Sequence, residues 1–135
     1  MEKIIIKIIL EMLGSPKEHV ESTMNLVIDK MKTYEKSKMI NHKLFPAEQL
    51  KDKLFFSTFV EAELELNNIE DVIGFCFDFM PSSVEILHPD SFMLKAPNIN
   101  NLINDLIARL HQYDMVLKNL HAQNLLMKKE LGKED

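Results

Sequence analysis

The 135-residue chain contains a single cysteine, Cys76, which excludes an internal disulfide and fits a reducing compartment. Cys76 lies among phenylalanines in the segment 74–80. A cysteine in such a setting is typically a small core residue, and burial raises its pKa, the opposite of what a nucleophile needs. We therefore expect Cys76 to be structural and not catalytic.

Positive charge and glycine are also scarce. Arg109 is the only arginine, and the net charge is −5. Because phosphate contacts require clustered lysine and arginine, this balance argues against nucleic-acid binding. With only three glycines the chain has no phosphate-cradling loop, and the sequence predicts no cofactor.

No apolar run is long enough to cross a membrane. The longest, 4–13, is interrupted by Lys7 and Glu11 and falls short of the roughly 20 residues that a spanning helix needs. It also lacks the basic start and the cleavage site of a signal peptide. A composition of 46% hydrophobic and 27% charged residues therefore predicts a soluble, cytoplasmic protein.

Several segments show strand periodicity. Residues 3–13 are rich in isoleucine and apolar on both faces, which is typical of a central strand covered on both sides. Residues 54–66 alternate between an apolar face and a face that turns from aromatic to acidic, so they predict a strand with one core face. Shorter strands are predicted at 39–45 and 83–87.

Two helices are predicted between these strands. Ser15 and Glu18 form a capping box around Pro16 at the start of the first helix; Asn67 and Asn68 signal a turn and N-cap before the second. The expected buried stripes are Val20, Met24, Val27, Met31 and Tyr34 in the first helix, and Ile69, Val72, Ile73, Cys76 and Met80 in the second.

The order β-α-β-β-α-β followed by a helix predicts an α+β fold. We expect a ferredoxin-like sandwich over residues 1–97 and a long C-terminal helix over residues 98–135. In that topology the first and third strands are neighbours. Lys7 would then lie opposite one of Glu61, Glu63 and Glu65.

The most specific pattern lies in the last helix, where residues recur at steps of four and three. The ten positions, which we call the seam, are Ile99, Ile103, Leu106, Leu110, Tyr113, Leu117, Leu120, Asn124, Met127 and Leu131. A heptad sustained over four repeats is typical of a coiled coil. Asn124, at an a position, favours two parallel strands in one register, and Arg109 and Asp114 would pair between such chains.

The seam predicts a homodimer, but two other arrangements fit the same residues. Leu102 and Ile107 widen the apolar stripe in the first half of the helix. This width suggests that the first half packs on its own domain, against the second face of strand 3–13. The other arrangement pairs the helix with a different helical protein.

Candidate chemistry is confined to a few polar residues. Glu61, Glu63 and Glu65 share one strand face and are the candidate metal ligands, because clustered carboxylates bind Ca²⁺ or Mg²⁺ or raise one another's pKa. A solvated strand end is the alternative interpretation. The histidines show no zinc-site spacing; they are His19, His42, His88, His111 and His121.

Two segments, Gly74–Leu87 and Ala108–Met115, resemble a family of small uncharacterised archaeal proteins, and the likeness extends to the helix entry at Gly14–Val20. The resemblance implies an archaeal, cytoplasmic protein and brings no activity, cofactor or site residue. The order of elements is also similar to that of ligand-sensing ACT-like domains, a likeness of fold that carries no function.

These observations favour a non-enzymatic, homodimeric interaction or regulatory protein. A second hypothesis is a metal-binding protein or enzyme of unrecognised type, which uses the acidic strand face with Lys7 or His88. A third is a nucleic-acid accessory protein that binds through a groove formed by the dimer.

Overall fold

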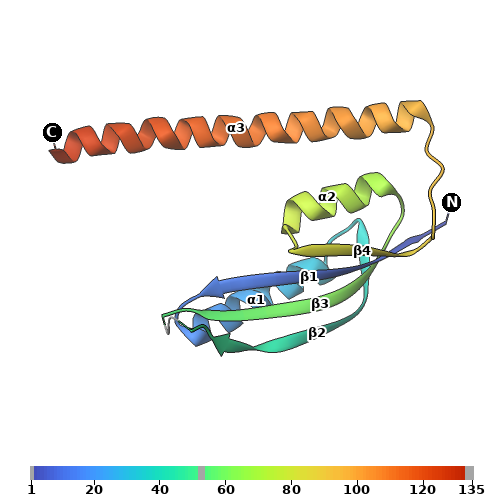
Figure 1. The fold of residues 1–135 in the computed structure, drawn as a ribbon, viewed down its shortest axis with the longest axis horizontal. Helices are drawn as coiled ribbons and strands as arrows, with labels where there is room; N and C mark the ends of the chain where they lie inside the picture. The colour runs from blue at the N-terminus through green and yellow to red at the C-terminus, as the bar shows by residue number, and fades with distance from the viewer. Residues whose placement is uncertain (1, 52–53, 133–135) are drawn as a thin grey trace. The chain divides into compact units, whose positions relative to one another are not determined.

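The computed structural model describes residues 2–51 and 54–132. The chain divides into two compact units, Met1–Phe92 and Met93–Asp135. The first unit contains β1 (Ile4–Gly14), α1 (Lys17–Lys32), β2 (Ser37–Gln49), β3 (Phe56–Leu66), α2 (Ile69–Phe79) and β4 (Ser83–His88), and the second contains α3 (Ala96–Gly132) (Figure 1). The α+β class and the long terminal helix expected from the sequence are confirmed.

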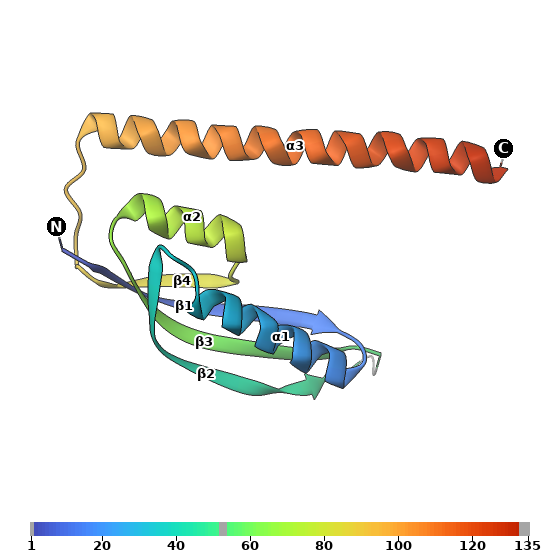
Figure 2. The ribbon, with the colours of Figure 1, turned by 180° about the vertical axis from the view of Figure 1, so that it is seen from behind.

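The four strands form one antiparallel sheet in the order β2-β3-β1-β4 (Figures 1 and 2). β1 is central, as its two apolar faces predict, and pairs with β3 on one side and β4 on the other. The expected pairing of the first and third strands is confirmed. Lys7 stands in register with Glu63, and Ile9 stands in register with Glu61.

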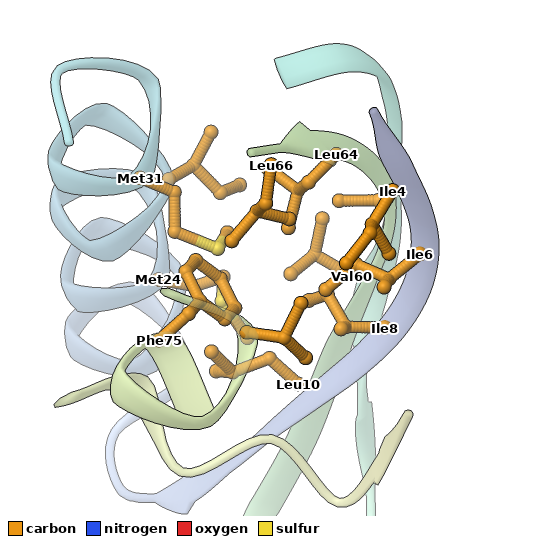
Figure 3. Packing of buried hydrophobic residues seen from close by; sticks show 13 residues of the cluster. Ile4, Ile6, Ile8, Leu10, Met24, Met31, Val60, Leu64, Leu66 and Phe75 are labelled. Atoms are coloured by element: carbon orange, nitrogen blue, oxygen red, sulfur yellow. The ribbon is translucent and has the colours of Figure 1, made fainter. Parts of the chain in front are cut away.

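The core lies between one face of the sheet and the helices α1 and α2. Its strand residues are Ile4, Ile6, Ile8 and Leu10 of β1 and Val60, Ala62, Leu64 and Leu66 of β3, and its helix residues are Met24, Ile28, Met31, Val72 and Phe75. Figure 3 shows Met24 and Phe75 pointing toward the strand residues. Both helices pack on this face, and Ile5 and Ile9 on the opposite face of β1 are only half-buried.

The start of α1 differs from the sequence prediction. The N-cap is Pro16, in extended backbone, and no side chain among residues 2–51 and 54–132 caps the helix. The capping box expected from Ser15 and Glu18 is therefore wrong, because Pro16 itself takes the cap position and Ser15 lies one residue too early. Ile28 is buried in α1, while the predicted Val27 packs at the edge of the core.

In α2 the cap was predicted correctly and part of the buried face was not. The Asn68 side chain accepts a hydrogen bond from the Asp71 N–H at 2.8 Å. Phe75, absent from the predicted stripe, is fully buried, whereas Met80 lies beyond the helix at φ 52° and is 69% exposed. Because apolar residues surround most of α2, their spacing alone does not select the face that meets the sheet.

β2 is longer than the strand predicted at 39–45, since it runs from Ser37 to Gln49. Its register against β3 shifts between Met39 and Asn41 and again between Phe45 and Glu48. At the second shift the buried hydroxyl of Thr58 donates a hydrogen bond to the Phe45 carbonyl at 2.6 Å. Because of these irregularities the strand continues beyond Pro46, and the alternation of apolar and polar residues does not reveal its full length.

Candidate interaction helix and acidic sheet face

α3 places all ten seam residues on one uninterrupted helix of 37 residues. At 1.5 Å per residue it is about 55 Å long. It begins at Ala96, two residues before the predicted start. Because no break interrupts it, the steps of four and three place the seam residues in one continuous stripe. This stripe drifts by about 20° per heptad on a straight helix and stays on one side when two helices supercoil.

The seam is exposed. None of the residues described in α3 is buried, and within the seam only Leu106 is even half-buried. Leu117, near the middle, keeps 65% of its surface accessible. A helix in water gains most of its stability by packing an apolar face against something. The seam is therefore the strongest candidate for a functional surface.

Charged residues flank the seam. Asp114 Oδ2 lies 2.9 Å from the Lys118 ammonium one turn further along the same helix. This ion pair is exposed, so it supports the helix only modestly. Asp114 and Arg109 are the two residues for which the sequence predicts pairing between chains. A carboxylate accepts more than one donor, so the contact with Lys118 leaves room for a second cation.

The three candidate metal ligands lie on the face of the sheet opposite α1 and α2, which we call the second face. The Lys7 ammonium lies 3.4 Å from Glu61 Oε2, and the Asn41 amide donates a hydrogen bond to Glu63 Oε1 at 3.2 Å. Same-face residues two positions apart on a strand are about 7 Å apart. Glu61, Glu63 and Glu65 therefore meet their cross-strand neighbours and do not converge on one point.

Each of the three glutamates has one lysine among its two cross-strand neighbours. Lys38 stands in register with Glu65, and Lys43 with Glu61. On the other side of β1, Glu85 stands in register with Lys7. In residues 2–51 and 54–132, no three His, Cys, Asp or Glu side chains gather as metal ligands would. The geometry is that of cross-strand charge pairing, which stabilises a sheet.

Toward the start of β3 the second face turns aromatic, as its alternation predicts. The rings of Phe45 and Phe59 stack with centroids 4.6 Å apart, and the Lys43 ammonium lies 4.9 Å from the centre of the Phe45 ring. The Ser57 hydroxyl donates a hydrogen bond to Glu11 at 3.0 Å. Much of this face is thus occupied by contacts among its own side chains.

The remaining candidates are His88, which stands in register with Ile5 at the edge of the sheet, and Cys76, which lies in α2. His88 ends β4, and its Nε2 lies 3.2 Å from Glu2 Oε2 in an exposed contact. Burial raises the pKa of the Cys76 thiol, in agreement with the structural role expected for it. Sequence reasoning missed the hydrogen bond that the Tyr34 hydroxyl donates to Asp78 at 2.6 Å. The two residues are 44 positions apart in the chain, and no sequence pattern connects them.

Comparison with known proteins bears on the whole chain. The model of the MJ0538 family matches residues 5–134. The chain belongs to the MJ0538 family. The matched residues include those of the sheet and of the seam. No curated protein and no solved structure matches the chain. Because the family name states no activity, function is argued below from the geometry.

Among the helices of the described residues, α3 included, none combines the length and the apolar character that crossing a bilayer requires.

Proposed function

We propose that this member of the MJ0538 family is a non-enzymatic interaction or regulatory protein that forms a homodimer through a coiled coil of α3. The observation that carries the proposal is the seam, ten heptad positions on one continuous helix with an exposed apolar side. A second copy carries a seam of the same length and spacing, so the apolar positions of the two helices match each other.

The edges of the sheet make strand addition a poor alternative route to a dimer. β2 carries two register shifts, Pro46 and the charged residues Lys38 and Lys43. β4 is only six residues long and is followed by Pro89. Bulges, prolines, charges and short length all oppose the pairing of an edge strand with another chain. The helix is therefore the favoured means of association.

For the first unit we propose a ferredoxin-like arrangement. Support comes from the order β1-α1-β2-β3-α2-β4, from the central position of β1 and β3, and from the packing of both helices on one face. An experimental structure with right-handed crossovers from β1 to β2 and from β3 to β4 would support this arrangement. A left-handed crossover would contradict it.

We also propose a cytoplasmic setting, which the lone free thiol of Cys76 supports.

The dimer is tested by light scattering with in-line size exclusion on the wild type and on two variants. We expect a wild-type mass of twice the 15.7 kDa chain. Leu117→Glu should dissociate the dimer, because it places unpaired carboxylates in the seam. Ala122→Glu adds the same charge at an f position, away from the seam, and should leave the mass unchanged. A monomeric wild type, or equal masses for the two variants, would reject the proposal.

A further inference from the structure

The orientation of the α3 pair follows from the positions of its few polar residues. We infer that two copies of α3 pair in parallel and in register, with Asn124 opposite Asn124 of the partner subunit. The inference rests on the proposed dimer and adds to it the direction and alignment of the helices. It is reached by comparing the contacts that each alignment of this continuous helix would create.

In the parallel alignment every seam residue meets its own counterpart. Asn124 then faces a second amide, and each amide offers the donor and acceptor that the other needs. At the flanks Leu102 lies beside the partner's Ile107, and Arg109 lies beside the partner's Asp114. The next two flank pairs are Val116 with the partner's His121 and Gln123 with the partner's Lys128. The parallel alignment therefore brings opposite charges together at Arg109 and gives Asn124 a partner of its own kind.

An antiparallel pair with full overlap creates conflicts at the same positions. Asn124 then lies opposite the partner's Leu106, which offers its amide no hydrogen bond. Asp114 lies opposite the partner's Asp114, a like-charge contact. A buried amide without a partner and two facing carboxylates both destabilise a pair, so this alignment is disfavoured.

Sliding the antiparallel pair by one heptad gives the best rival. Asn124 then meets the hydroxyl-bearing side chain of the partner's Tyr113, and Arg109 meets the partner's Glu130. That shift leaves Ile99 and Ile103 beyond the overlap and exposed to water. Since α3 runs unbroken from Ala96 to Gly132, only the parallel pair uses the whole seam and satisfies Asn124 at the same time.

Parallel pairing has a consequence for binding. Residues 89–95 join β4 to α3, and seven extended residues reach at most about 25 Å. In a parallel dimer both copies of the Met1–Phe92 unit are tethered to the same end of the coil. Two identical domains held on short tethers raise each other's effective concentration for a partner that offers two sites. The parallel dimer would thus bind such a partner bivalently, whereas an antiparallel dimer would hold its two domains at opposite ends of the coiled coil.

The test is disulfide trapping in the full chain, with Cys76→Ala as background. Ile103→Cys and Met127→Cys are each introduced alone, and the proteins are oxidised with diamide separately and after mixing under reducing conditions. Asn119→Cys, at a c position away from the seam, is the matched control. Mass spectrometry identifies which chains are joined, and light scattering of the reduced proteins confirms that each variant is still a dimer.

Parallel pairing predicts that each seam variant joins to itself at least tenfold faster than Asn119→Cys, and that mixing produces no 103–127 disulfide. A disulfide that forms only in the mixture would overturn the inference and leave the proposed dimer standing. Leu110→Cys mixed with Met127→Cys tests the antiparallel alignment shifted by one heptad, in which these two positions face each other, and a 110–127 disulfide would also overturn the inference. A reduced dimer in which no seam variant, alone or in either mixture, reacts faster than the control would instead reject the seam itself. If a substitution dissociates the dimer, Leu110→Cys and Leu120→Cys form an equivalent pair with the same interpretation.

Discussion

Replacing Asn124 by leucine removes the only amide from the seam and leaves an otherwise apolar heptad. We expect the dimer to become more stable and its assembly to become less uniform. An asparagine at an a position lowers the stability of a coiled coil while restricting its register and number of strands. The change therefore separates stability from specificity at one position, and the two effects are measured independently.

The gain in stability follows from the two leucines that the pair would bury. Full burial of a leucine side chain contributes about 1.5–3 kcal/mol. A two-stranded seam covers an a-position residue only in part, and the paired amides contribute some stability of their own, so we expect a net gain of about 2–4 kcal/mol per dimer. For a folding unit of the size of this chain, 135 residues, that gain in stability raises the melting midpoint by about 10–20 °C.

The assay is thermal melting followed by circular dichroism at 222 nm and fixed chain concentration, with light scattering on the same samples. Asn124→Leu should raise the midpoint of the concentration-dependent transition and broaden the mass distribution toward larger assemblies. Asn119→Leu makes the same change in helix propensity outside the seam, so it should raise the midpoint much less and leave the mass unchanged. An unchanged midpoint together with an unchanged mass for Asn124→Leu would show that this residue does not lie in a seam, and would refute the reasoning.

Three further predictions concern the first unit. Phe75→Ala should lower the free energy of unfolding by about 3–5 kcal/mol in urea titrations because the ring is fully buried. Phe77 is only half-buried, so Phe77→Ala should lower the free energy of unfolding clearly less. Equal losses for the two variants would contradict the assigned core. Because burial raises the pKa of Cys76, iodoacetamide should alkylate it more slowly in the folded chain than in urea. The contribution of the protonated thiol to stability should be present below the pKa of the unfolded thiol and be lost as the pH rises through the raised pKa of the folded thiol. Equal alkylation rates in the folded and unfolded chains would contradict the burial of Cys76. Ca²⁺ or Mn²⁺ should leave the melting midpoint unchanged, since the glutamates of β3 do not converge, and an upward shift would favour a metal-binding function instead.

Patterns that depend on near neighbours in the chain could be predicted from the sequence. The isoleucines of β1 placed it at the centre of the sheet, and the alternation in β3 predicted both its core face and the aromatic-to-acidic change on the other face. Asn68 was recognised as a helix cap. The length of α3 and the spacing of its seam were also visible, because a heptad is a property of one segment. Each of these signals repeats within a few residues, so no distant contact is needed to interpret it.

Other features were decided only when distant segments met. The sheet selected Phe75 as the buried ring of α2, although several apolar residues around that helix have similar burial energies on their own. Contacts with β3 extended β2 through two register shifts to Gln49. The hydrogen bond from Tyr34 to Asp78 joins the segment that follows α1 to α2. In each case competing local choices differ little in free energy, and contacts between residues far apart in the chain select among them.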